Sequence, residues 1–469
     1  MNILDSLYGF TVFLPLVFGL YLAIERFRFA LVNRKILNYG LLSINFISLI
    51  LYFSLTYFIF IDKYTLSIDF TLFKFFDVEL LPSINLNENN AIYLLLSNIL
   101  YFLINIFVLR FFKSKKQFLF TKQRYNILFS VLIFSTYFFI VSSNILQAVI
   151  CWMATSAFVF VFCYLDIFKM NTKANITRMM RINFLSDFSF LIAFMLMFRY
   201  VVLFSKNFLI NMYFIEPDAF FDTMIQINSS LEVKIIALAL LIAVFARLII
   251  FPFNCYYSFL ASSSDIVYPV VVCINNIFGC YLCSNFCTLF EYFPKILLII
   301  KVSAVLTIVT SFIFLFFEKN IKIIFGYIFS ILNALFLLFL YANENISCIY
   351  FGCLFVLLLI LMKLFSFDKN NFPKRFINKT KGFYLEKLHI FVFEKLPQKT
   401  AFIFLASFDW FFDFILNTLN KIFSFAVHIF LIKYEKQNKF SLLKTIFLIF
   451  AAIVIFLIIV ILFKGADFG

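Results

Sequence analysis

Histidine is nearly absent from this chain, and glycine and proline are scarce. Among 469 residues there are two histidines, His389 and His428, with nine glycines and eight prolines. A membrane cytochrome that holds haem between paired histidines needs several of them in facing spans, and a haem–copper oxidase core needs more. So few glycines leave no loop of the kind that cradles a phosphate, and no nucleophile–base constellation is visible. The sequence therefore argues against haem, haem–copper and P-loop chemistry in this chain.

Charged residues are also few, at 13%, whereas 64% of the residues are hydrophobic and 77 are phenylalanine. With a mean hydropathy of +1.03, this is the composition of a protein that crosses a membrane many times. Abundant Phe, Ile, Asn and Lys with little Gly, Pro and Ala is what AT-rich codons give, which indicates an organellar gene. The first residues lead into a span without an arginine-rich presequence. Synthesis inside an organelle explains this start, and so does an uncleaved bacterial membrane protein.

Cysteines cluster in one apolar stretch. Cys280 and Cys283 form a C-x-x-C pair, with Cys273 and Cys287 nearby. A zinc or thiol-redox site is one interpretation, but no histidine or carboxylate accompanies them inside the span. Small polarizable residues at helix contacts are the favoured interpretation.

Hydropathy predicts an all-α polytopic membrane protein with about twelve spans. The spans are expected near residues 7–25, 37–61, 91–112, 126–143, 145–168, 182–205, 234–254, 266–290, 295–317, 321–341, 347–366 and 441–464.

The connecting loops alternate in charge, which predicts an orientation. Basic residues follow the first, third, fifth and eleventh spans: Arg26, Arg28, Arg34, Lys35; Lys113, Lys115, Lys116, Lys122, Arg124; Lys169, Lys173, Arg178, Arg181; Lys369, Lys374, Arg375, Lys379, Lys381. Acidic residues follow the second and sixth: Asp62, Asp69, Asp77, Glu79, Glu88; Glu216, Asp218, Asp222, Glu232. By the positive-inside rule both termini lie outside. The net charge of +15 is then an orientation signal, and nucleic-acid binding is not expected.

Residues 383–434 are predicted to form one long helix that Pro397 kinks or splits. About 50 helical residues would extend about 75 Å, far more than a hydrocarbon layer of about 30 Å, so we expect the helix to lie along the inner membrane surface. One polar stripe follows its helical period: Asp409, Asp413, Asn417, Asn420, Ser424 and His428. The expected organisation is a bundle of about eleven spans over 1–366, a basic linker over 367–382, the lateral helix and an anchor span over 441–464.

Ionisable residues at membrane depth are candidate functional groups. Arg247 lies about one turn before Pro252, which should break the seventh span and free backbone carbonyls to face water or a neighbour. Lys301 lies within the ninth span, Asp187 one to two turns into the sixth and Asp265 at the start of the eighth. These four are the candidates for a proton path, and no Asp or Glu is placed at the centre of a predicted span.

The alternative is that such groups reach the interface and are solvated there. This is the favoured interpretation for Asp265 and for Asp166, Lys169 and Lys234, and Asp166 and Lys169 are spaced to pair on a helix. For Arg247 and Lys301 the two interpretations are balanced.

Four segments of the chain carry motifs that match one protein family when they are taken together. The first comprises Ser143–Leu146, Cys151–Ala154, Asn175 and Asn183–Asp187, which are similar to N-L-x-x-x-x-x-G-W-E-x and N-R-I-G-D. The second comprises Ala246–Leu248, Phe251–Phe253, Ser263–Asp265 and Gly279, which are similar to a broken seventh span and the helix after it. The third is Asn320–Lys322 with Gly326–Tyr327, similar to D-I-K-R-x-x-A-Y. The fourth is Tyr384–Leu388 with Asp413–Asn417, similar to the family's closing motifs, lateral helix and anchor. In this order the segments resemble the antiporter-like subunits of respiratory complex I, NADH dehydrogenase subunit 5 and its bacterial relatives.

The departures from that family concern its proton-carrying residues. The family's membrane glutamate falls at Met153, its seventh-span lysine near Val244 and a later lysine near Leu359 or Ile360. Lys363 lies one turn further on. About four spans of the family's second half are missing before the basic linker. The resemblance therefore implies membership of the complex more than pumping by this subunit.

Two functions from different classes follow. The first is a reduced subunit of the membrane arm of mitochondrial complex I, in the inner membrane with its lateral helix on the matrix side. It would bind neighbouring membrane subunits and lipids, need no cofactor of its own, and transfer protons, if at all, through Asp187, Arg247 and Lys301. The second is a stand-alone cation/proton transporter, for which an inverted repeat would be expected and none is visible. An accessory subunit of another respiratory complex is a further alternative.

Overall fold

A computed structural model describes residues 3–27, 34–62, 66–69, 73–75, 78–80, 83–114, 119–142, 145–164, 170–204, 230–318, 320–340 and 346–366. These residues all belong to the first of two compact units, Met1–Asn378, the second being Lys379–Gly469. The predicted linker, lateral helix and anchor span lie outside the described residues, and so do Asp166 and Lys169.

Each of the eleven predicted spans before residue 367 coincides with a helix. The helices are α1 (Ile3–Phe27), α2 (Arg34–Asp62), α3 (Glu88–Ser114), α4 (Leu119–Ile140), α5 (Ile145–Cys163), α6 (Met170–Phe204), α8 (Ser230–Leu248), α9 (Tyr256–Leu260), α10 (Val267–Asn285), α11 (Cys287–Tyr292), α12 (Pro294–Phe317), α13 (Ile321–Phe339) and α14 (Ile346–Ser366), with a 3-10 turn, η2, at Phe253–Cys255. Nine stretches within the described residues are long and apolar enough to cross a membrane, and α14 holds a shorter one. The prediction of a polytopic helical membrane protein is confirmed.

Four short strands lie between α2 and α3, where only an acidic loop was expected. β1 (Leu66–Asp69) pairs antiparallel with β4 (Ser83–Leu86), and β2 (Phe73–Phe75) pairs with β3 (Val78–Leu80). In β4, Ile84 and Leu86 are both buried, as alternation along a strand requires for residues on one face. The strands are too short to register in a hydropathy profile, and pairing satisfies the backbone of a long connection.

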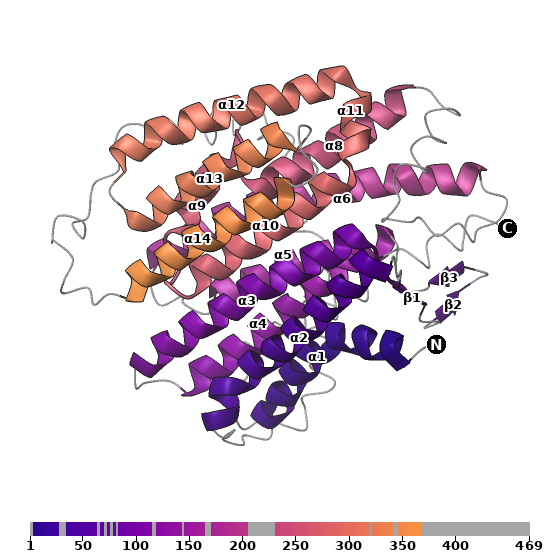
Figure 1. The fold of residues 1–469 in the computed structure, drawn as a ribbon. Helices are drawn as coiled ribbons and strands as arrows, with labels where there is room; N and C mark the ends of the chain where they lie inside the picture. The colour runs from indigo at the N-terminus through magenta and orange to yellow at the C-terminus, as the bar shows by residue number, and fades with distance from the viewer. Residues whose placement is uncertain are drawn as a thin grey trace, which may run out of the picture. The chain divides into compact units, whose positions relative to one another are not determined.

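Helix α10 is the central helix of the bundle (Figure 1). It packs against α8, α3, α4, α5 and α14, and 94% of its apolar stretch is buried, against 33% for the apolar stretches of α2 and α12. Gly279 lets α8 approach closely, because a Cβ there would lie 2.7 Å from the Leu248 side chain. On another face, Tyr281 donates to the Ile140 carbonyl at 2.6 Å, which ties α10 to α4. Polar residues on α10 are therefore sealed from solvent and must find partners inside the bundle.

Candidate functional site

Helix α8 breaks inside the membrane-spanning stretch Leu231–Leu260. It ends at Leu248, followed by Ile249 with a φ of 58°. The Ile250 amide donates to the Phe245 carbonyl at 3.0 Å, which is the long hydrogen bond of a Schellman C-cap. Glycine usually occupies the left-handed position, and an L-residue there costs about 1–2 kcal/mol. The sequence predicted a break at Pro252, and the structure confirms it with the helix ending a few residues earlier.

Neighbouring helices satisfy the backbone groups that the break exposes. Asn333 of α13 donates to the Leu248 carbonyl at 2.6 Å, and the Phe251 amide donates to Thr307 of α12 at 2.8 Å. Because irregular backbone at membrane depth is tolerated only where protein or water satisfies it, these contacts fix the break in place. The sequence predicted carbonyls that face water or a neighbour, and the Leu248 carbonyl faces the neighbouring helix α13.

Arg247, one residue before the end of α8, is completely buried. Its guanidinium donates to the Asp187 carboxylate on α6 at 3.1 Å and to the Asn275 amide oxygen on α10 at 3.1 Å. It also donates to the Trp152 carbonyl at 3.3 Å and to the Ser156 hydroxyl, both on α5. One cation therefore joins four helices, and its positive charge has a direct counter-ion.

Aromatic and hydroxyl groups enclose this ion pair. The Arg247 guanidinium lies 4.7 Å from the Trp152 ring centroid and 5.8 Å from that of Phe278, so both rings contribute cation–π contacts. Ser156 donates to Asp187 at 2.7 Å. Beyond Arg247, Asn275 donates to the Tyr256 hydroxyl at 2.9 Å. We call the set Trp152, Ser156, Asp187, Arg247, Tyr256 and Asn275 the Arg247 centre.

A second, neutral group of polar side chains follows on the far side of α10. Asn333 donates to the Asn276 amide oxygen at 3.0 Å, and the Tyr350 hydroxyl of α14 donates to Asn333 at 2.5 Å. Since Asn275 and Asn276 are neighbours in sequence, polar groups extend from α5 to α14 through α10. Among the described residues, the carboxyl and guanidinium groups of this series are those of Asp187 and Arg247.

The structure brings two of the four predicted proton-path residues together. Asp187 lies near the middle of α6, which corrects the expectation that it sits one to two turns into a span. The span edge was misjudged because α6 continues well before the apolar stretch begins. Asp265 lies elsewhere and pairs with Lys322 of α13 at 2.8 Å. Lys301 is exposed on α12 and is not part of the Arg247 centre.

The positions that replace the family's ionisable residues do not restore a second charge to the centre. Met153 is 40% exposed, and Leu359 and Ile360 are 44% and 45% exposed, whereas Val244 is buried. Met153 thus faces outward although Trp152 beside it contacts Arg247. The proton-path role of the four candidates stays a prediction.

Sequence reasoning missed the neutral members of the site. Trp152, Ser156, Tyr256 and Asn275 were not proposed as functional, and neither was Lys322 as the partner of Asp265. The Asn275–Asn276 pair inside an apolar span is the signal that could have pointed to them, because buried amides require partners.

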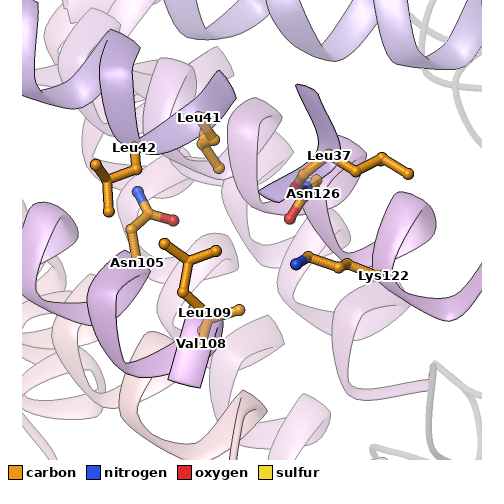
Figure 2. Close-up of a pocket in the computed structure, with 8 residues that line it drawn as sticks. All are labelled: Leu37, Leu41, Leu42, Asn105, Val108, Leu109, Lys122 and Asn126. Carbon is orange, nitrogen blue, oxygen red and sulfur yellow. Dashed lines mark hydrogen bonds between the residues drawn. The ribbon is translucent and has the colours of Figure 1, made fainter. Parts of the chain in front are cut away.

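A small polar cavity lies apart from this centre, between α2, α3 and α4 (Figure 2). Lys122, Asn105 and Asn126 line it together with aliphatic side chains of the same helices. All three polar side chains are buried, and Asn126 donates to the Leu37 carbonyl at 2.8 Å. The cavity has room for about one water molecule, so it is far too small for an organic cofactor.

The cysteines of α10 are buried free thiols, including Cys280 and Cys283. Within the described part of the chain, no three His, Cys, Asp or Glu side chains gather as metal ligands would. Their surroundings are those of helix contacts.

Comparison with known proteins gives a likeness of fold. No protein-family model matches the sequence, and no curated protein matches it significantly. A chain of the Mrp complex from Dietzia sp. DQ12-45-1b superposes with a TM-score of 0.57 at 12% identity, covering 76% of this chain and 37% of that chain. The chain thus spans little more than a third of that Mrp protein.

Two respiratory complexes contain chains of similar fold. A chain of the membrane-bound sulfane sulfur reductase, an archaeal respiratory membrane complex, has a TM-score of 0.56 at 13% identity, covering 76% of this chain and 70% of that one. A chain of respiratory complex I from Thermus thermophilus has a TM-score of 0.58 at 13% identity, covering 76% and 71%. This chain is therefore a multi-pass membrane protein with a fold found in subunits of multisubunit membrane complexes.

Proposed function

We propose that this chain is an antiporter-like subunit of the membrane arm of respiratory complex I in the mitochondrial inner membrane, with a mainly structural role. The observation that carries the proposal is the Arg247 centre, a fixed ion pair in the middle of a fold that complex I uses. NADH oxidation and quinone reduction belong to other chains of such a complex, and this subunit then needs no cofactor of its own.

The structural role follows from the chemistry of the pair. A proton carrier must gain and lose a proton, and an arginine guanidinium keeps its proton in proteins. Asp187 accepts from both Arg247 and Ser156, so a cation and a hydroxyl hold its carboxyl group in place. We infer that the pair serves to join α6 to α8. Among the described residues, the amides and hydroxyls beyond Arg247 provide hydrogen bonds but no second carboxyl group.

The proposed placement in the membrane rests on the sequence. Alternating loop charge supports termini on the intermembrane-space side and basic loops on the matrix side. The amphipathic stretch 383–434 would lie on the matrix face and bind neighbouring subunits, with 441–464 as its anchor. Lipids would surround the exposed apolar faces.

Co-migration on a native gel tests this proposal. Mitochondria from the source organism, solubilised in mild detergent, are separated, stained for NADH dehydrogenase activity and probed for this chain by peptide mass spectrometry. The proposal expects the chain in the active band and its depletion from that band when the complex is dissociated. Recovery only as a small species away from the activity contradicts it.

A stand-alone cation/proton transporter is the second candidate, and the break in α8 is the observation that favours it. Discontinuous helices at membrane depth are typical of ion-binding sites in transporters. Purified protein in liposomes with a sodium or potassium gradient would then acidify or alkalinise the lumen. A lumen pH that does not respond to the gradient rejects this candidate.

A further inference from the structure

Helix α12 presents one side chain that does not suit a lipid-facing surface. Its outer stripe contains Leu298, Val302, Val305, Val309 and Phe312, which are 64%, 50%, 50%, 48% and 55% exposed. Lys301 lies in the same stripe and is exposed as well. We call these six residues the Lys301 face. The opposite side of α12 faces the bundle, where Thr307 is buried and accepts a hydrogen bond from the Phe251 amide.

Lys301 is too deep in α12 to be an ordinary end residue. It follows Pro294, the first residue of the helix, by seven positions, which is about 10 Å along the axis. Beyond the first turn it is the only charged residue of α12. The described residues include salt bridges of Arg247 with Asp187 and of Lys322 with Asp265, and no described carboxylate pairs with Lys301. A lysine facing hydrocarbon at that depth is costly, and such groups normally face protein or water.

We propose that the Lys301 face binds a transmembrane helix of a neighbouring subunit, and that this helix carries an Asp or Glu opposite Lys301. The inference rests on the proposed function, because it supposes a multisubunit membrane complex. Charge complementarity specifies the partner, since an apolar stripe with one central cation fits an apolar helix with one carboxylate.

Two observations favour a different polypeptide as the partner. Among the described residues of a second copy of this chain, the carboxylate in the middle of a helix is that of Asp187, which is buried against Arg247. The superposition covers 71% of the Thermus complex I chain, so surfaces that the rest of that chain covers can require another subunit here.

Photo-cross-linking from the centre of the face tests the proposal. Val302 is replaced by p-benzoylphenylalanine in the assembled complex, the native membranes are irradiated, and the adduct is identified by mass spectrometry. The expected adduct is a peptide of another subunit, from an apolar span, with an Asp or Glu within one turn of the attachment site. Adducts with lipid only, with this chain, or with a span that lacks a carboxylate overturn the proposal.

Substitution at Lys301 provides an independent arm. Lys301→Glu should reduce the cross-link from position 302 by about tenfold or more, because two carboxylates would then face each other, whereas Lys301→Arg should retain it. Lys295→Glu, at the exposed start of α12, is the matched control and should leave the yield unchanged. Equal yields from Lys301→Glu and wild type reject the charge pairing.

The native gel read on the same samples separates the two proposals. Co-migration with NADH dehydrogenase activity together with lipid adducts would overturn this inference alone. A carboxylate-bearing partner found in a complex without that activity would support the inference while contradicting the proposed function.

Discussion

The Asp187 carboxylate and the Arg247 guanidinium lie 3.1 Å apart, near the middle of α6 and at the broken end of α8. Each is held by further partners, Ser156 on one side and Asn275 on the other. Burying an ion pair costs free energy of desolvation. Removing only one partner lowers stability further, because the remaining charge is then buried without compensation.

Removing one partner of this pair should therefore destabilise the bundle strongly. Arg247→Met is expected to lower the free energy of unfolding by about 3–5 kcal/mol, and Asp187→Leu by a similar amount, because each leaves a buried charge without its counter-ion. The double variant should recover most of that loss. The measurement is the temperature at which the buried thiols Cys273, Cys280 and Cys283 react with a maleimide dye in detergent. A double variant no more stable than either single variant would contradict the proposed coupling.

Gly326 of α13 lies directly against Tyr257 of α9. A Cβ at this position would overlap the Cβ of Tyr257 and lie 2.6 Å from its ring, so a helix must shift to admit it. Gly326→Ala should cost about 1–3 kcal/mol through overpacking, despite the better helix propensity of alanine.

Gly352 on α14 is the matched control for that substitution, because a Cβ there meets nothing within 4 Å. Gly352→Ala should leave the thiol-reactivity temperature unchanged or raise it slightly. If both variants shift the thiol-reactivity temperature equally, overlap with Tyr257 is not the cause of any loss of stability in Gly326→Ala.

The pair of Asp265 and Lys322 should behave differently from the central pair. Its side chains are 26% and 14% exposed, and Lys322 also donates to the Ser263 carbonyl. Asp265→Asn is expected to cost less than about 1 kcal/mol. Because solvent and salt screen such a pair, wild type and variant should converge in stability between low and high potassium chloride. A large loss that salt does not reduce would place Asp265 among the buried functional groups.

The helices of the first unit were predictable from the sequence because apolar runs of span length leave no other structure possible in a membrane. The break in α8 was predictable from Pro252, whose ring prevents continuation of the helix. The strands between α2 and α3 were not, since three- and four-residue pairings produce no periodicity long enough to detect.

The site was predictable only as far as its charges stand out in apolar sequence. Arg247 and Asp187 were identified individually, but their pairing depends on how α6 and α8 pack, which spacing along one chain does not encode. Lys301 stands out in the sequence as Arg247 does, whereas Asp265 was expected at an interface. The structure separates Lys301 from Arg247 because Arg247 points into the bundle and Lys301 is exposed on α12.

The proton-to-electron stoichiometry of the purified complex in liposomes tests the central claim most directly. A complex carrying the double variant Asp187→Leu with Arg247→Met, with assembly checked on a native gel, is compared with wild type during NADH oxidation. The account predicts full assembly and an unchanged number of protons per electron. A lower stoichiometry in a fully assembled complex would show that this pair carries protons, and would contradict the structural role.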